Sequence, residues 1–151
     1  MKIVRITVFL LTATLGQMAM AHCEVPCGIY GDDTRFDMLS EHLDTIEKAM
    51  VQATELGAAE TVNYNQVVRW TMTKEHHADA FRDILIQYFL TQRIKPVAPE
   101  AEGRDLYLTQ LERIHRMVVL SMKCKQGTDT ANVAEARKLL KAFREAYSHK
   151  H

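Results

Sequence analysis

Apolar residues recur at spacings of three and four along most of the chain after residue 32, which is the period of an amphipathic α-helix. No stretch shows the strict alternation of a half-buried strand. The first helical segment extends from about residue 33 to Gly57, where Asp33 or Thr34 can cap its start and the glycine suits the position after its end. Its apolar stripe consists of Phe36, Leu39, Leu43, Ile46, Met50 and Ala53.

Three further helical segments follow. The second covers about residues 59–93 and stops before Pro96 and Pro99, because proline cannot continue a helix. The third covers residues 104–125 and ends at Gly127, and a fourth follows Asp129 or Thr130 as its cap. The residues of the third segment expected to face inward are Tyr107, Leu108, Leu111, Ile114, Val118 and Met122. Four amphipathic helices with short links predict an all-α fold, an antiparallel up-down-up-down four-helix bundle.

The first 21 residues have the three parts of a secretory signal peptide. Lys2 and Arg5 give a positive start, a short apolar run follows, and Ala19-Met20-Ala21 fits the small-x-small cleavage pattern. The apolar run is shorter than the roughly 20 residues that span a membrane. The sequence therefore predicts cleavage before His22, a mature domain of residues 22–151, export to the periplasm or the exterior, and no membrane association after the signal is removed.

Composition sets limits on the function. The chain has 151 residues, 47% hydrophobic and 25% charged, which is typical of one globular domain. Its 19 basic and 19 acidic residues balance, and removal of Lys2 and Arg5 leaves 17 against 19, a net charge of −2. Nucleic-acid binding is not expected, because it requires a basic stripe or patch.

Residues 22–30, His-Cys-Glu-Val-Pro-Cys-Gly-Ile-Tyr, contain the strongest candidate chemistry. Cleavage before His22 would place a free α-amine, an imidazole, the amide of Cys23 and the thiols of Cys23 and Cys27 in one small loop. An α-amine with a pKa of about 8 loses its proton to a metal at little cost. Sulfur and nitrogen donors in a nearly planar chelate suit Ni(II) or Cu(II) better than magnesium or calcium. We call residues 22–30 the hook.

Two simpler interpretations of the cysteines and histidines compete with the metal hypothesis. Cys-x₃-Cys in an exported protein is often a disulfide. Cys124 lies on an apolar helix face, where we expect a buried small hydrophobic residue. The remaining histidines are expected on helix surfaces, at boundaries of the core, or in the C-terminal tail; they are His42, His76, His77, His115, His149 and His151.

The hook resembles that of the nickel-dependent superoxide dismutase family at each defining position: His22, Cys23, Pro26, Cys27, Gly28 and Tyr30. The resemblance implies a four-helix bundle and one nickel ion per subunit, bound by the His22 amine and imidazole, the Cys23 amide and thiolate, and the Cys27 thiolate. It implies that Tyr30 gates the open face of the metal. It further implies that Asp37 and Arg69 orient the axial imidazole, and that Tyr88 lies near the site.

The resemblance predicts an oxidoreductase that converts superoxide to oxygen and hydrogen peroxide by Ni(III)/Ni(II) cycling, assembled as a homohexamer. Two hypotheses from other classes stay open. One is an exported nickel- or copper-binding protein without turnover, and the other is a structural bundle whose N-terminus is pinned by a Cys23–Cys27 disulfide. The gate tyrosine and the residues around the axial imidazole favour the enzyme.

Overall fold

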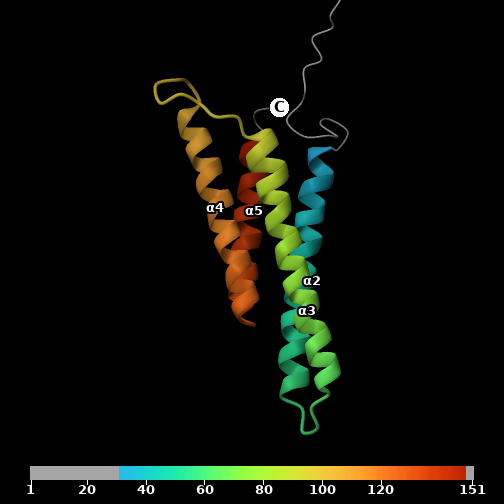
Figure 1. Ribbon diagram of the computed structural model, residues 1–151. Helices are drawn as coiled ribbons and strands as arrows, with labels where there is room; N and C mark the ends of the chain where they lie inside the picture. Colours follow the sequence, from blue (N-terminus) through green and yellow to red (C-terminus); the bar gives the residue numbers. More distant parts are fainter. Residues whose placement is uncertain (1–30, 149–151) are drawn as a thin grey trace, which may run out of the picture.

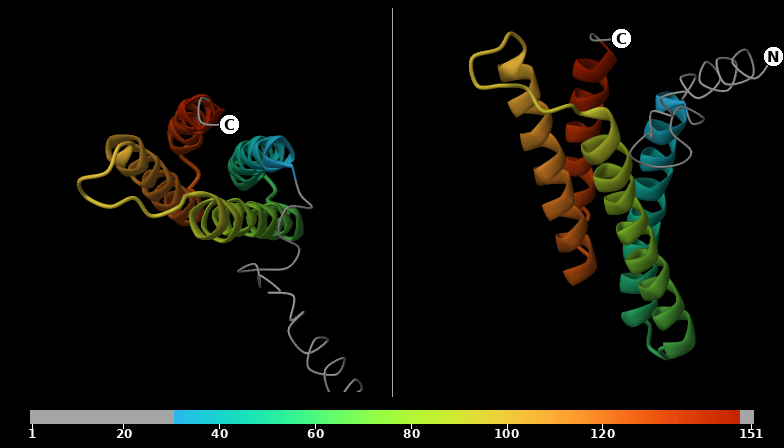
Figure 2. Two further views of the ribbon diagram at one scale, coloured as in Figure 1. Left: turned by 90° about the horizontal axis from the view of Figure 1, so that it is seen from above. Right: turned by 45° about the horizontal axis from the view of Figure 1, so that its top comes forward.

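The structure is a computed structural model that describes residues 31–148 of the chain. Its helices are α2 (Asp32–Gly57), α3 (Tyr64–Asp83), η1 (Ile84–Arg93), α4 (Arg104–Gln126) and α5 (Ala131–Ser148). Because η1 continues α3 without a break, the helices form four rods. Residues 31–148 contain no strand. Successive rods are antiparallel, as expected: in Figure 1 α2 and α4 run downward, and α3 with η1 and α5 run upward. The helices α2 and α4 each pack against both α3 and α5 (Figure 2).

The bundle is not evenly staggered. The α2–α3 hairpin extends beyond the loop that joins α4 to α5 (Figure 1). The core is continuous across the other end and is rich in aromatic residues, with Phe36, Phe89, Phe143 and Tyr147 in mutual ring contact. The sequence pattern therefore located the buried stripe of α2 correctly, since its members are all buried.

Several helix ends differ from the expectation. Gly31, not Asp33 or Thr34, is the N-cap of α2, and the two predicted caps lie inside its first turn. Gly57 is the last helical residue and has no positive φ; among the described residues only Gly103 has one, at 84°. The helix α3 begins at Tyr64, five residues later than predicted. The Asn63 side chain caps this start, since it accepts a hydrogen bond from the amide of Gln66.

The buried face of α4 is also rotated from the predicted one. Leu108 and Met122 were expected inside, but they are 45% and 48% exposed. Ile114 was placed correctly, and Tyr107, Leu111 and Val118 are partly buried and pack against the core, as expected. The other positions that face the neighbouring rods are Gln110, Met117, Leu120, Ser121 and Cys124. The apolar period alone allowed two adjacent faces, and the contacts of α4 with both α3 and α5 selected one.

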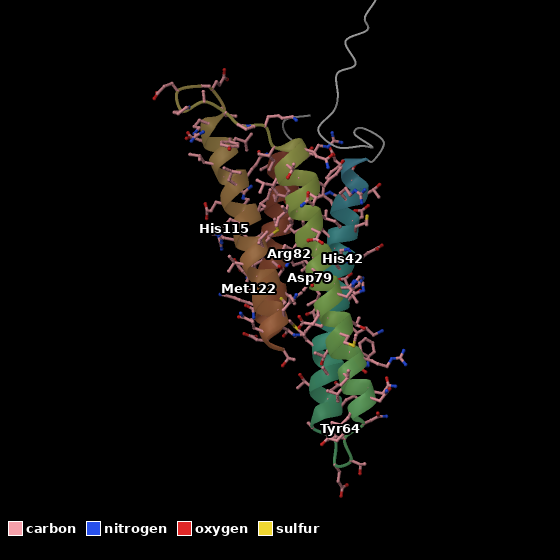
Figure 3. All side chains as sticks on the ribbon, viewed as in Figure 1. His42, Tyr64, Asp79, Arg82, His115 and Met122 are labelled. Carbon is pink, nitrogen blue, oxygen red and sulfur yellow. The ribbon has the colours of Figure 1, made fainter. Side chains whose placement is uncertain are left out.

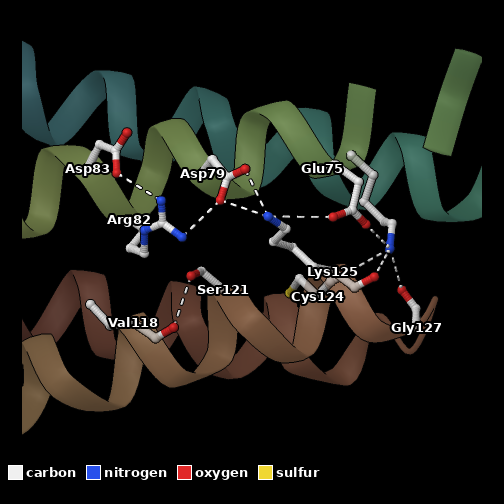
Figure 4. Close-up of polar contacts among 10 residues, drawn as sticks. Glu75, Asp79, Arg82, Asp83, Val118, Ser121, Cys124, Lys125 and Gly127 are labelled. Carbon is white, nitrogen blue, oxygen red and sulfur yellow. Dashed lines mark hydrogen bonds and ion pairs between the residues drawn. The ribbon is translucent and has the colours of Figure 1, made fainter. Parts of the chain in front are cut away.

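A buried lysine joins α3 to the end of α4. The Nζ of Lys74 donates hydrogen bonds to the carbonyls of Cys124, Lys125 and Gly127 at 2.8, 2.6 and 3.1 Å. Lysine at a helix C-terminus satisfies carbonyls that have no partner within the helix and complements the helix dipole. Beside it, the Nζ of Lys125 contacts both carboxylate oxygens of Asp79 at 2.8 Å (Figure 4). Gly127 does end α4, as predicted.

We expect Lys74→Met to lower the free energy of unfolding by about 3 kcal/mol, because hydrogen bonds to a charged group contribute about 1.5–3 kcal/mol and the carbonyls lose their donor. Methionine keeps the apolar stem, so the change isolates the ammonium group. Urea denaturation of the full chain measures the loss. Lys123→Met, at an exposed position in the last turn of α4, is the matched control. Equal stability of the two variants would contradict this account.

Within residues 31–148, no helix has the length and the apolar content that a membrane span requires.

Candidate metal centre

The predicted metal ligands His22, Cys23 and Cys27, and the predicted gate Tyr30, lie outside the described residues. In sequence the hook joins the bundle at Gly31, directly before α2. The described residues therefore define the surroundings of the point to which the hook is attached. These surroundings contain a compact polar cluster.

The carboxylate of Asp32, the first residue of α2, collects three side chains from two other helices. The hydroxyl of Tyr88 donates to its Oδ1 at 2.5 Å, and the Nε of Arg93 lies 2.8 Å from the same oxygen. The hydroxyl of Tyr147 donates to its Oδ2 at 2.7 Å, and Arg93 Nη2 donates to the Tyr88 oxygen at 2.8 Å. We call these four residues the Asp32 cluster. It joins α2, η1 and α5 at Asp32, which follows Tyr30 by two residues in the sequence.

The cluster holds Asp32 in its charged form. Burial raises the pKa of Asp32, but the hydrogen bonds from Tyr88 and Tyr147 and the charge of Arg93 outweigh it, so the pKa lies below its usual value. Burial and the bond to Asp32 raise the pKa of both tyrosines. At neutral pH the tyrosines therefore remain hydroxyl donors to a carboxylate.

The residues predicted to orient the imidazole, Asp37 and Arg69, and the tyrosine predicted near the site, Tyr88, lie in three different places. Tyr88 is in the Asp32 cluster, beside the attachment point of the hook. Asp37 lies on the outer face of α2, where its carboxylate pairs with Arg144 of α5 at 3.0 Å and is 64% exposed. Arg69 is exposed on α3, more than about 20 Å from Tyr88 along the helix axis. Within one described chain, the structure thus brings Tyr88, but not Arg69, to the base of the hook.

Sequence reasoning missed Asp32, Arg93 and Tyr147. Arg93 was missed because residues 84–93 were expected to be α-helical, which would turn Tyr88 and Arg93 away from each other. They are instead a π-helix, in which residues five apart face the same way, and Ile94 N donates to Phe89 O at 2.9 Å with that spacing. π-Helical turns occur frequently at functional sites. The signal in the sequence that could have pointed to this pair was the Tyr-x₄-Arg spacing of Tyr88 and Arg93.

Comparison with known proteins identifies the family. The family model of the nickel-containing superoxide dismutases matches residues 17–151, nearly the whole chain and all of the predicted hook. The chain therefore belongs to the nickel-containing superoxide dismutase family. It is an oxidoreductase with a nickel cofactor, as the resemblance of the hook implied. No curated protein and no solved structure matches the chain.

The donors available in the two parts of the chain agree with nickel bound at the hook. Within residues 31–148 no group of three or more histidine, cysteine or acidic side chains has the geometry to hold a metal ion. Cys124 is buried with 1% exposure, and burial raises the pKa of its thiol to about 11, so it stays protonated at neutral pH. Its predicted role as a buried hydrophobic residue is confirmed. The hook offers two thiols, an imidazole and a prospective amine, a donor set that suits nickel.

We expect Asp32→Asn to lower the free energy of unfolding by about 2 kcal/mol at pH 7, because three charge-assisted contacts weaken together. The folded pKa of Asp32 is depressed, so its stabilising effect is present above the ordinary pKa of 3.8 and is lost as pH falls through the folded value. The difference in melting temperature between the wild type and the variant should therefore shrink below about pH 4. Asp105→Asn, at an exposed position in the first turn of α4, is the control, and it should show neither effect.

Proposed function

We propose that this dismutase converts two superoxide anions and two protons to oxygen and hydrogen peroxide at a single nickel ion held by His22, Cys23 and Cys27. The ion, when bound, supplies Ni(III)/Ni(II) cycling. Family membership over residues 17–151, with the nine hook residues inside the matched region, is the observation that carries this proposal. It favours the enzyme over a nickel- or copper-binding protein without turnover and over a structural bundle.

The hook residues have separate tasks in this proposal. The thiolates and the amide of Cys23 donate electron density and so favour the higher oxidation state. The His22 imidazole would be a further ligand of the ion, and Tyr30 would order substrate or water beside it. Asp37 and Arg69 are proposed to orient the His22 imidazole, and changes in groups that orient a metal ligand typically alter affinity or activity by 10–100-fold.

The Asp32 cluster supports this arrangement because it fixes the start of α2, the helix that follows the hook. The Tyr88 hydroxyl donates a hydrogen bond to Asp32, the first residue of α2, at 2.5 Å, and Arg93 donates one to the Tyr88 oxygen at 2.8 Å. Asp32 is two residues from Tyr30, so its fixed position limits where the gate residue can lie. Tyr88 thus acts, in this proposal, as a positioning residue through the backbone of α2.

Arg69 favours a site shared between copies of the chain. Arg69 is exposed on α3, far from the residue at which the hook joins α2, so in a shared site it would orient the imidazole of another subunit. The projecting α2–α3 hairpin also exposes an apolar stripe of Tyr64, Val68 and Met72, at 74%, 54% and 65% exposure. These two observations support assembly, and a homohexamer is the state that the resemblance implies. Export of residues 22–151 after cleavage of residues 1–21 is likewise part of the proposal.

The direct test combines metal content, intact mass and activity of the purified mature protein. We expect one nickel per chain, a mass that begins at His22, and superoxide removal in stopped-flow measurements that scales with nickel content. A protein that binds nickel at His22 but does not remove superoxide would leave the metal site standing and refute the catalytic proposal.

A further inference from the structure

Two histidines meet at the contact between α2 and α3, away from the Asp32 cluster. The Nδ1 atoms of His42 and His77 are 2.9 Å apart, and their ring centroids are separated by 5.1 Å at an angle of 63°. Both side chains are half-buried. His42 lies on the middle of α2 (Figure 3), ten residues or about 15 Å along the helix from Asp32. The sequence had indicated only a surface position for His42.

The surroundings keep both rings neutral. Burial and the neighbouring His77 and His76 lower the pKa of His42, against a smaller opposing effect of Glu41. Burial and His76 lower the pKa of His77. Two neutral imidazoles at 2.9 Å share one hydrogen, with the Nδ1–H of one ring donating to the Nδ1 of the other. Neither ring then has to lose a charge before it can bind a cation.

The separation of the two nitrogen atoms also matches that of two ligands on one metal ion. Imidazole nitrogen binds Zn²⁺ at about 2.0–2.1 Å, so two such ligands at an angle of about 90° are about 2.9 Å apart, and at the tetrahedral angle about 3.3 Å. A pair already spaced at 2.9 Å therefore needs a widening of only a few tenths of an ångström, together with a rotation of the two rings that turns both lone pairs toward the ion. Two aliphatic side chains at these positions would also pack against each other, but they would not place two nitrogen donors at this spacing.

We propose that His42 and His77 form a second metal site, an Nδ1,Nδ1 chelate that takes a divalent transition-metal ion and bridges α2 to α3. On binding, the shared hydrogen moves from Nδ1 to Nε2 of the same ring, so both Nδ1 lone pairs face the ion and no net proton is released. Imidazole donors select Zn²⁺, Ni²⁺ or Cu²⁺ over Mg²⁺ and Ca²⁺.

The site is open on its other side. Within the described part of the chain no third donor completes a ligand group, so water fills the remaining positions. The ring of His76 lies 5.4 Å from that of His77 and is exposed to solvent. It is not one of the proposed ligands. Two protein ligands and an exposed outer face define a labile site that exchanges its ion.

The test uses the full nickel-loaded protein, in which the hook is already filled, titrated with Zn²⁺ by calorimetry. The wild type and His115→Gln, a control at an exposed position of α4, should each bind one zinc ion more than His42→Gln or His77→Gln. Any residual zinc should bind at least tenfold more weakly in the two variants. Zinc should raise the melting temperature of the wild type and the control, and not of the variants. Equal zinc stoichiometry and affinity in all four proteins would overturn the proposal.

A measurement on the unmodified chain guards against loss of folding in the variants. In ¹H–¹⁵N spectra of the histidine rings, zinc should shift Nδ1 of His42 and His77 and leave hydrogen on both Nε2 atoms. A response confined to other histidines would overturn the assignment. Because neither residue belongs to the hook or the Asp32 cluster, the variants should retain superoxide removal, so this test can fail without affecting the proposed function.

Discussion

Replacing Cys23 or Cys27 by serine should lower superoxide removal by more than about 100-fold and abolish the thiolate-to-nickel absorption, while the helical circular dichroism stays near that of the wild type. The loss exceeds the 10–100-fold effect of changes outside the ligand shell because a ligand itself is removed. Serine keeps the shape of cysteine but is not a soft anionic donor at neutral pH. The helices persist because the four rods are held by a hydrophobic core that residues 36–147 supply.

The third cysteine provides a control with the same chemistry. Cys124→Ser places a hydroxyl among apolar residues, so we expect a loss of about 1–3 kcal/mol in the free energy of unfolding and unchanged nickel absorption. Activity per bound nickel should equal that of the wild type. A nickel spectrum that depends on Cys124, or one that survives the loss of both hook cysteines, would show that the donor set has been assigned incorrectly.

Retaining Ala21 at the mature N-terminus should be as damaging as removing a thiol. The additional residue converts the His22 amine, with an ordinary pKa of about 8, into an amide and would move the imidazole away from the ion. Loss of superoxide removal by more than about 100-fold is expected, with helix content and the melting temperature of the apo protein unchanged. Stopped-flow activity and the nickel absorption spectrum measure the effect.

One added residue at the other end of the chain is the matched control. An alanine after His151 makes the same change in length without touching the hook, and it should leave nickel binding and activity intact. Full activity of the protein that retains Ala21 would refute coordination by the terminal amine. Loss of activity in both extended proteins would indicate a general sensitivity of the assembly to its termini.

These expectations assign separate physical roles to the two parts of the protein. The hook supplies donors close together in sequence, which requires no fold to concentrate them. The bundle supplies a fixed origin for the hook, through a carboxylate held by two tyrosines and an arginine. Changes in the Asp32 cluster should therefore alter stability and the position of the hook, whereas changes in the hook should alter the metal and leave the bundle folded.

The sequence alone was sufficient for the four helical rods of residues 31–148, the all-α class and the family. Helix periodicity is a local property, and the stripe from Phe36 to Ala53 is buried as its spacing predicted. The hook was recognisable for the same reason, since its donors fall within six consecutive residues, from His22 to Cys27. The burial of Cys124 also followed from its place on an apolar face.

Only the tertiary structure decided which side chains meet. Tyr88 and Tyr147 reach Asp32 from 56 and 115 residues away, and His42 meets His77 across 35 residues. Lys74 reaches the end of α4 across about 50 residues, as its bond to Cys124 shows. Period and composition carry no information on such pairings, because they depend on how far each helix is rotated and shifted against its neighbours. The π-helix at residues 84–93 is the clearest case, since an α-helical period turns Arg93 away from Tyr88 and the packed structure turns it back.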